Sequence, residues 1–92
     1  MLDRAFFDEE FVEMVHDCSR DHEDSNVVVE VVTDTGERLD ILRVDAIESG
    51  VRVCTRDDRL VFLPYDHIAH IDVSPTTDQR RVGFRLITTS SA

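Results

Sequence analysis

Lysine and tryptophan are both missing from this chain of 92 residues, and its ten basic residues are all arginine. Aspartate and glutamate number 20, so the formal net charge is -10. A field of this sign repels nucleic-acid phosphates and anionic membranes unless the arginines cluster. Plain solubility is the simplest reason for so acidic a chain, and a high-salt habitat and a GC-rich gene are the alternatives.

Membrane spans, targeting signals and catalytic motifs are missing as well. No apolar run reaches the roughly 18 residues that a membrane-spanning helix requires, and residues 1–4 do not open a signal peptide. There is no Gly-rich phosphate loop, no nucleophile elbow and no zinc-type pairing of cysteines. We therefore predict a protein without membrane association that is not an enzyme and requires no cofactor.

The two cysteines, Cys18 and Cys54, lie far apart in a chain whose length fits one small domain. We expect two thiols in a reducing cytoplasm, with a single disulfide as the alternative. Neither cysteine is expected to be a nucleophile, because nothing in the sequence places a base beside it. A domain of this size buries only about two-thirds of its unfolded surface, so self-association is one way of burying more.

Residues 3–20 have helical spacing. Apolar residues recur at steps of three and four, namely Phe7, Phe11, Met14 or Val15, and Cys18. Acidic residues 8–10 fall near the helix N-terminus, where negative charge is favourable. We expect this helix to pack over one open end of a sheet. The alternative is a docking helix that binds a partner protein through Phe6, Phe7 and Phe11.

Five short strands follow the helix, at residues 27–33, 37–47, 51–55, 60–63 and 68–73. In the second strand neither alternating set is purely apolar, so we expect a bulge or bend near Ile41 and Leu42 that switches the inward face. Such bent strands let a small sheet curl, and closure hides its edges. The predicted fold is therefore mainly β, an N-terminal helix followed by a strongly bent, five-stranded small barrel.

Residues 1–75 form the single domain on this interpretation, and residues 76–92 form a C-terminal extension. Residues 74–78 are expected to break the structure, because they combine Ser74 and Pro75 with polar neighbours. Residues 80–87 alternate weakly and are a candidate sixth, edge strand. Residues 88–92 are expected to fray.

Three parts of the sequence carry a resemblance to a known family: Gly36 in the first hairpin, Asp45 near the end of strand two, and the corner Tyr65-Asp66-His67 leading into residues 68–71. The order of parts resembles the Sm-like family, including its Hfq-type branch, over about residues 5–75. In that family an N-terminal helix precedes a five-stranded, strongly bent, SH3-like barrel. A second glycine usual in strand two is absent here, and Asp66 stands where the family's corner has a lysine. An acid there weakens the expected central-pore binding of uridine.

The resemblance implies a homo-oligomeric ring of about six or seven subunits, in which strand four of one copy pairs with strand five of the next. Both faces of strand four are apolar, more than one small barrel needs to bury, so we expect both to be covered. The expected interface residues are Leu60, Val61, Phe62, Leu63, Ile68 and His70. At such an interface His70 would make assembly depend on pH.

RNA is the partner that the resemblance implies, and the candidate contacts are Tyr65, His67, Arg52 and Arg56. Against this, the abundant carboxylates are expected to pair with the arginines, and aromatic platforms for stacked bases are scarce. A metal cluster of Asp66, His67, His70 and Asp72 is a weaker hypothesis, and we predict no metal site.

Two functions follow from the sequence. The first is a non-enzymatic, Sm-like oligomeric scaffold or binding module whose binding to RNA is weakened by its acidity. The second is a small β-rich protein–protein interaction domain that binds no nucleic acid.

Overall fold

The computed structural model describes residues 2–23, 25–76 and 83–84. It is mainly β, with one N-terminal helical segment followed by five antiparallel strands, which confirms the predicted fold class. The elements are η1 (Phe6–Glu10, a π-helical turn), α1 (Phe11–Asp21), β1 (Asn26–Thr33), β2 (Arg38–Ala46), β3 (Gly50–Thr55), β4 (Leu60–Pro64), η2 (Tyr65–His67, a 3-10 turn) and β5 (Ile68–Thr76). Within the described ranges, no helix is long and apolar enough to cross a membrane.

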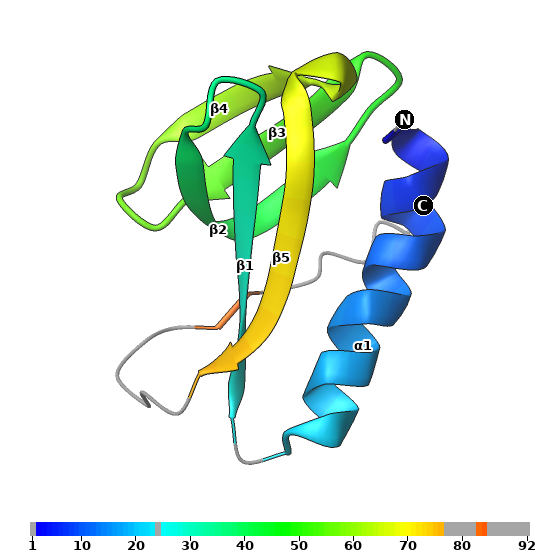
Figure 1. Ribbon diagram of the computed structural model, residues 1–92, viewed down its shortest axis with the longest axis vertical. Coiled ribbons are helices and arrows are strands. Elements are labelled where there is room, and N and C mark those ends of the chain that lie inside the picture. The colour runs from blue at the N-terminus through cyan, green and yellow to red at the C-terminus, as the bar shows by residue number, and fades with distance from the viewer. Residues whose placement is uncertain (1, 24, 77–82, 85–92) are drawn as a thin grey trace.

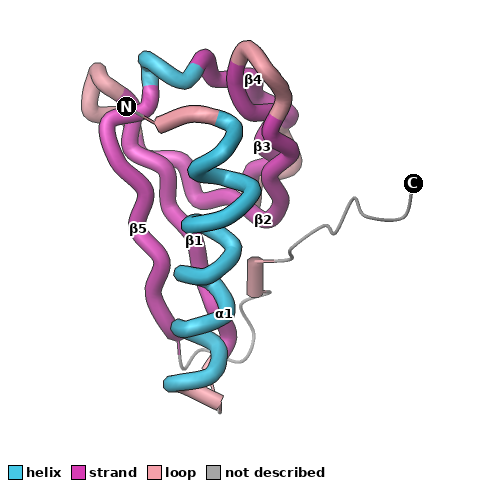
Figure 2. Tube along the Cα trace, turned by 90° about the vertical axis from the view of Figure 1, so that its right-hand side faces the viewer, coloured by secondary structure: helices cyan, strands magenta, loops and turns pink. Residues whose placement is uncertain are grey.

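The five strands form one sheet in the order β4-β3-β2-β1-β5, so β4 and β5 are its two edges. Only Tyr65–His67 joins these edges. A flat five-stranded sheet is about 19 Å wide, whereas the four Cα steps from Pro64 to Ile68 reach at most about 14 Å. The sheet must therefore be rolled, and Figures 1 and 2 show β3 and β4 turned across the direction of β1 and β5.

The prediction of a closed barrel is wrong for this chain alone. No ladder joins β4 to β5 among the described residues, because β4 pairs with β3 and β5 pairs with β1. After the 3-10 corner, β5 turns away from β4 and runs along β1 and the helix (Figure 1). The sheet is rolled but open, and each edge strand keeps one side without a strand partner.

The sheet bends in β2, at the place where the sequence predicts a switch in which side chains point inward. The β2–β3 register shifts between Ile41 and Arg43, which leaves Leu42 outside the ladder as a bulge. Before the shift β2 pairs with β1, from Arg38 to Ile41, and after it β2 pairs only with β3. The predicted bend near Ile41 and Leu42 is confirmed.

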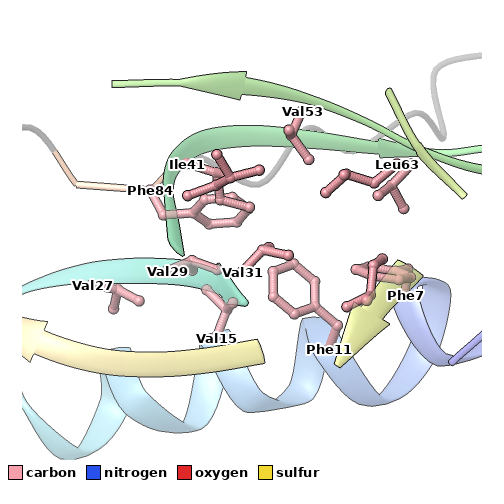
Figure 3. Packing of buried hydrophobic residues seen from close by; sticks show 13 residues of the cluster. Phe7, Phe11, Val15, Val27, Val29, Val31, Ile41, Val53, Leu63 and Phe84 are labelled. Atoms are coloured by element: carbon pink, nitrogen blue, oxygen red, sulfur yellow. The ribbon is translucent and has the colours of Figure 1, made fainter. Parts of the chain in front are cut away.

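The helical segment packs on the concave side of the rolled sheet, against β1 and β5. Phe7, Phe11 and Val15 point from the helix into the core, where they meet valines of β1 and β3 and Leu63 of β4 (Figure 3). The predicted apolar stripe is confirmed. Phe7 and Phe11 are core residues, so the docking-helix alternative loses two of its three contact residues, and Phe6 is half-buried against Phe7.

Strand β5 runs three residues beyond its predicted end. Ser74, Pro75 and Thr76 pair with Val28, Val27 and Asn26 of β1, although residues 74–78 were expected to break the structure. Proline is tolerated because β5 is an edge strand, on which a missing N–H on the solvent side costs no ladder bond.

The C-terminal part of the chain contributes to the core through Phe84. Its N–H donates to the carbonyl oxygen of Val27 at 2.7 Å, on the side of β1 that β2 leaves when it bends away. Its ring lies edge-on to Phe11, with centroids 5.5 Å apart, and is buried beside Ile41 (Figure 3). Phe84 therefore fills the gap that the bend opens. The rest of the candidate sixth strand and the tail at residues 88–92 lie outside the described residues.

Phe84→Ala should lower the free energy of unfolding by about 3 kcal/mol, because truncating a buried phenylalanine leaves a cavity. Met14→Ala is the control, since Met14 lies on α1 with 37% of its surface exposed. Urea unfolding followed by circular dichroism measures both. A loss for Phe84→Ala no larger than that of the control would show that the core closes without this residue.

Candidate functional site

The β4 edge carries the most exposed large apolar side chains among the described residues. Leu60 is 77% exposed and Phe62 is 47% exposed, whereas Leu63 is buried and Val61 is half-buried. Strand alternation explains the pattern, since Val61 and Leu63 face the core and Leu60 and Phe62 face outward. Within a single chain one face of this strand is therefore uncovered.

Gly50 of β3 fixes the position of Phe62. A Cβ atom on Gly50 would overlap the carbonyl oxygen of Leu63 and would lie 2.9 Å from Cζ of Phe62. The glycine therefore lets β4 approach closely and lets the Phe62 ring lie over the β3 backbone. The exposed face of β4 therefore has a defined shape, because Phe62 packs against the backbone of β3.

The β5 edge is more polar. Ile68 is buried in the core, and His70 lies exposed with its Nε2 atom 3.4 Å from the Asp72 carboxylate. Of the six predicted interface residues, Leu60, Phe62 and His70 are thus exposed on the two edges, Val61 is half-buried, and Leu63 and Ile68 face inward. Their backbones still lie on edge strands, which have one side without a strand partner in the described sheet.

The candidate RNA contacts do not come together at one place. Tyr65 packs its ring on Phe7, with centroids 5.9 Å apart, and its hydroxyl donates to the carbonyl oxygen of Ile47. Burial raises the pKa of the Tyr65 hydroxyl above its ordinary value. Tyr65 follows the end of β4 that pairs with Gly50, whereas Arg56 follows the opposite end of β3.

The other three candidate RNA contacts are bonded to residues of the same chain. The backbone oxygen of His67 accepts the N–H of Asp34 at 2.8 Å, which ties the 3-10 corner to the β1–β2 turn. Arg52 is paired with Asp45, and Arg56 is paired with Asp40. The expected pairing of these two arginines with carboxylates is confirmed.

Metal and thiol chemistry have little structural basis in the described part of the chain. Of the four proposed ligands, His70 and Asp72 lie together, and no group of three or more such side chains in these ranges is placed to hold a metal ion. Cys18 and Cys54 are both free and half-buried. Burial raises the pKa of the Cys18 thiol, as does the negative charge of Asp21, so its reactive thiolate is disfavoured.

A pocket of about 380 Å³ lies where β2 meets the turn between β3 and β4. Its lining residues are Arg38, Leu39, Asp40, Thr55, Arg56, Asp57 and Arg59. Sequence reasoning singled out Arg56 as a candidate RNA contact. It missed Arg38 and Asp40, which become neighbours of that turn only through the pairing of β2 with β3.

The β3–β4 turn that carries this pocket has the same hydrogen bonds as the β1–β2 turn. Each begins at a buried threonine, Thr55 or Thr33, whose hydroxyl accepts the N–H of the residue four positions on, at 3.0 and 3.1 Å. In each turn the fourth residue has positive φ, 67° at Asp58 and 89° at Gly36. These bonds hold Arg56 and Arg59 on either side of Asp57.

Asp57 is oriented within the turn by two donors. The Thr55 hydroxyl donates to one carboxylate oxygen, and Nε of Arg59 donates to the other at 3.0 Å. The threonine hydrogen bond, with the arginine charge beside it, lowers the pKa of Asp57 below its ordinary value. The carboxylate therefore stays ionised at neutral pH and fixes the position of Arg59.

Asp58→Gly should raise the free energy of unfolding by about 0.5–1 kcal/mol, because glycine adopts positive φ without the steric cost that a side chain incurs. Asp34→Gly in the other turn is the control and should destabilise by a similar amount, since φ at Asp34 is not positive. Thermal unfolding of both variants distinguishes the outcomes. Destabilisation by Asp58→Gly would mean that its side chain contributes more than its backbone strain costs.

Comparison with models of protein families, with curated proteins and with solved structures finds no match to this chain. The resemblance to the Sm-like family therefore rests on the sequence features and on the order of elements.

Proposed function

We propose that this protein is a non-enzymatic, divergent Sm-like module that self-associates by pairing the β4 edge of one copy with the β5 edge of the next. The observation that carries the proposal is the open β4 edge, where Leu60 and Phe62 are 77% and 47% exposed. An unprotected apolar edge in a monomer is an aggregation hazard. A second copy would cover these side chains and supply the missing backbone hydrogen bonds.

The position of the two edges supports assembly into a ring. Both edges belong to one chain and are joined by the short corner Tyr65–His67, so each copy offers one donor edge and one acceptor edge. Such head-to-tail contacts generate closed rings when the rotation between copies closes. We place the module in the cytoplasm, a reducing compartment that suits its two free, half-buried thiols.

RNA is the ligand class that the resemblance implies for the assembled module, and the contacts of the described residues weaken it. Tyr65 is engaged by Phe7 and Ile47, and Arg52 and Arg56 are paired with carboxylates. RNA binding is accordingly proposed as weak and most easily measured at low salt. The alternative function, a protein–protein interaction domain, uses the same β4 edge to accept a strand from a different protein.

Light scattering on the purified chain should give about six or seven times the subunit mass of 10.6 kDa. Phe62→Glu should weaken association by roughly a hundredfold, because a charge replaces an apolar contact at the covered edge. Met14→Glu adds the same charge to an exposed apolar site on α1 and should leave association unchanged. A stable monomer for the unmodified chain would contradict the proposal and favour the alternative, a domain that accepts a strand from a different protein.

Self-association should become stronger between 0.1 and 1 M KCl, because the screening length falls from about 10 Å to about 3 Å. Each subunit carries a formal charge of -10, so bringing copies together in dilute salt opposes the apolar contacts. Sedimentation velocity across this salt range measures the change. Dissociation on raising the salt would mean that attraction between opposite charges, and not apolar contact, holds the copies together.

A further inference from the structure

We propose that the pocket between β2 and the β3–β4 turn binds a phosphate group. Three arginines and two aspartates line it, so its lining has one net positive charge in a chain whose formal charge is -10. The cavity of about 380 Å³ accommodates a phosphate with part of the molecule that carries it. This site lies in the turn that precedes β4, and its lining does not include the exposed β4 side chains Leu60 and Phe62.

The three guanidinium groups keep donors available after their ion pairs are formed. Arg38 uses Nη1 to reach Glu30 at 2.5 Å, Arg56 uses Nε to reach Asp40 at 3.0 Å, and Arg59 uses Nε to reach Asp57 at 3.0 Å. A guanidinium has five N–H donors, so each of these ion pairs leaves other donors for a ligand. The carboxylates hold the arginine side chains in place and reduce the entropy lost on binding.

Arg56 gives the sharpest evidence, because its Nη2 atom is buried and donates to no acceptor among the described residues. Its side chain is only 27% exposed, and its backbone N–H donates to the Asp40 carbonyl oxygen at 2.9 Å. A buried guanidinium donor without an acceptor is costly. Arg56 lines the pocket, and a small shift of its side chain would bring Nη2 to a ligand oxygen there.

Phosphate fits this donor set better than a single carboxylate does. Its oxygens spread over a tetrahedron and accept hydrogen bonds from several directions, whereas a carboxylate is planar and pairs with one guanidinium fork. Arginines from β2 and from the β3–β4 turn approach the pocket from two elements, as a tetrahedral anion requires. The phosphate belongs either to a small molecule such as a nucleotide or to a nucleic-acid backbone, and the probes below separate these sources.

The test is titration of the full-length, isotope-labelled chain with inorganic pyrophosphate at low salt, followed by amide NMR. Saturable shifts at Thr55, Arg56, Asp57 and Arg59 are expected. Arg59→Gln or Arg38→Gln should weaken binding by about tenfold, because each removes one charged donor. Arg20→Gln, on the exposed end of α1, removes the same charge elsewhere and should have little effect.

Asp57→Asn provides a change of opposite sign. Asparagine still accepts the Thr55 hydrogen bond but no longer holds Nε of Arg59. For a highly charged anion, the loss of a negative charge from the lining outweighs this loss of arginine positioning, so pyrophosphate should bind several-fold more tightly. Asp17→Asn on α1 makes the same change in net charge and is its control. Equal effects of the pocket variants and their α1 controls, or absence of saturable shifts at the turn, would overturn the proposal.

Two further probes identify the source of the phosphate. Adenosine monophosphate carries a terminal phosphate, and a short RNA without terminal phosphates carries only diesters. Binding of either probe at the turn supports the site. The probe that binds more tightly shows whether the phosphate comes from a small molecule or from a nucleic-acid backbone. Because monomer and oligomer both contain the pocket, failure of self-association leaves this test unaffected.

Discussion

The short corner between β4 and β5 is the constraint on which the rest of the structure depends. Three residues join the two edges of a five-stranded sheet, so the sheet cannot lie flat. The bulge at Leu42 supplies the bend, because it releases β2 from β1 and turns it toward β3. The helix then covers the concave side, where Phe7 and Phe11 complete the core.

The same roll determines which surfaces remain for binding. Where β2 leaves β1, Phe84 takes up the vacated backbone position and closes the core. Where β4 ends the sheet, Leu60 and Phe62 remain outside. Where β2 passes the β3–β4 turn, arginines from both elements line one pocket. The two proposed binding surfaces therefore lie at a sheet edge and at a turn. A domain of this size has too little interior volume to form a deep cleft.

Ion pairs within the chain determine which arginines are available at these proposed surfaces. Most exposed arginines of the described segments are held by carboxylates within the same chain, at distances of 2.5–3.6 Å where the pairs are of ordinary length. Pairs of this kind add little stability at the surface. Their larger effect is to remove arginines from a general nucleic-acid surface and to fix three of them around a single pocket.

The sequence by itself determined the elements: the helical stripe, five strands, the change of face in β2 and the proline corner are all local patterns of period 3.6 or 2. It also identified Leu60 and Phe62, because a strand apolar on both faces is visible without coordinates. Only the tertiary structure decided that the sheet stays open, that Pro75 continues an edge strand, that Phe84 belongs to the core, and that Arg38 joins Arg56 and Arg59. These outcomes depend on pairings between residues distant in sequence, and local periodicity carries no information about which strands will meet.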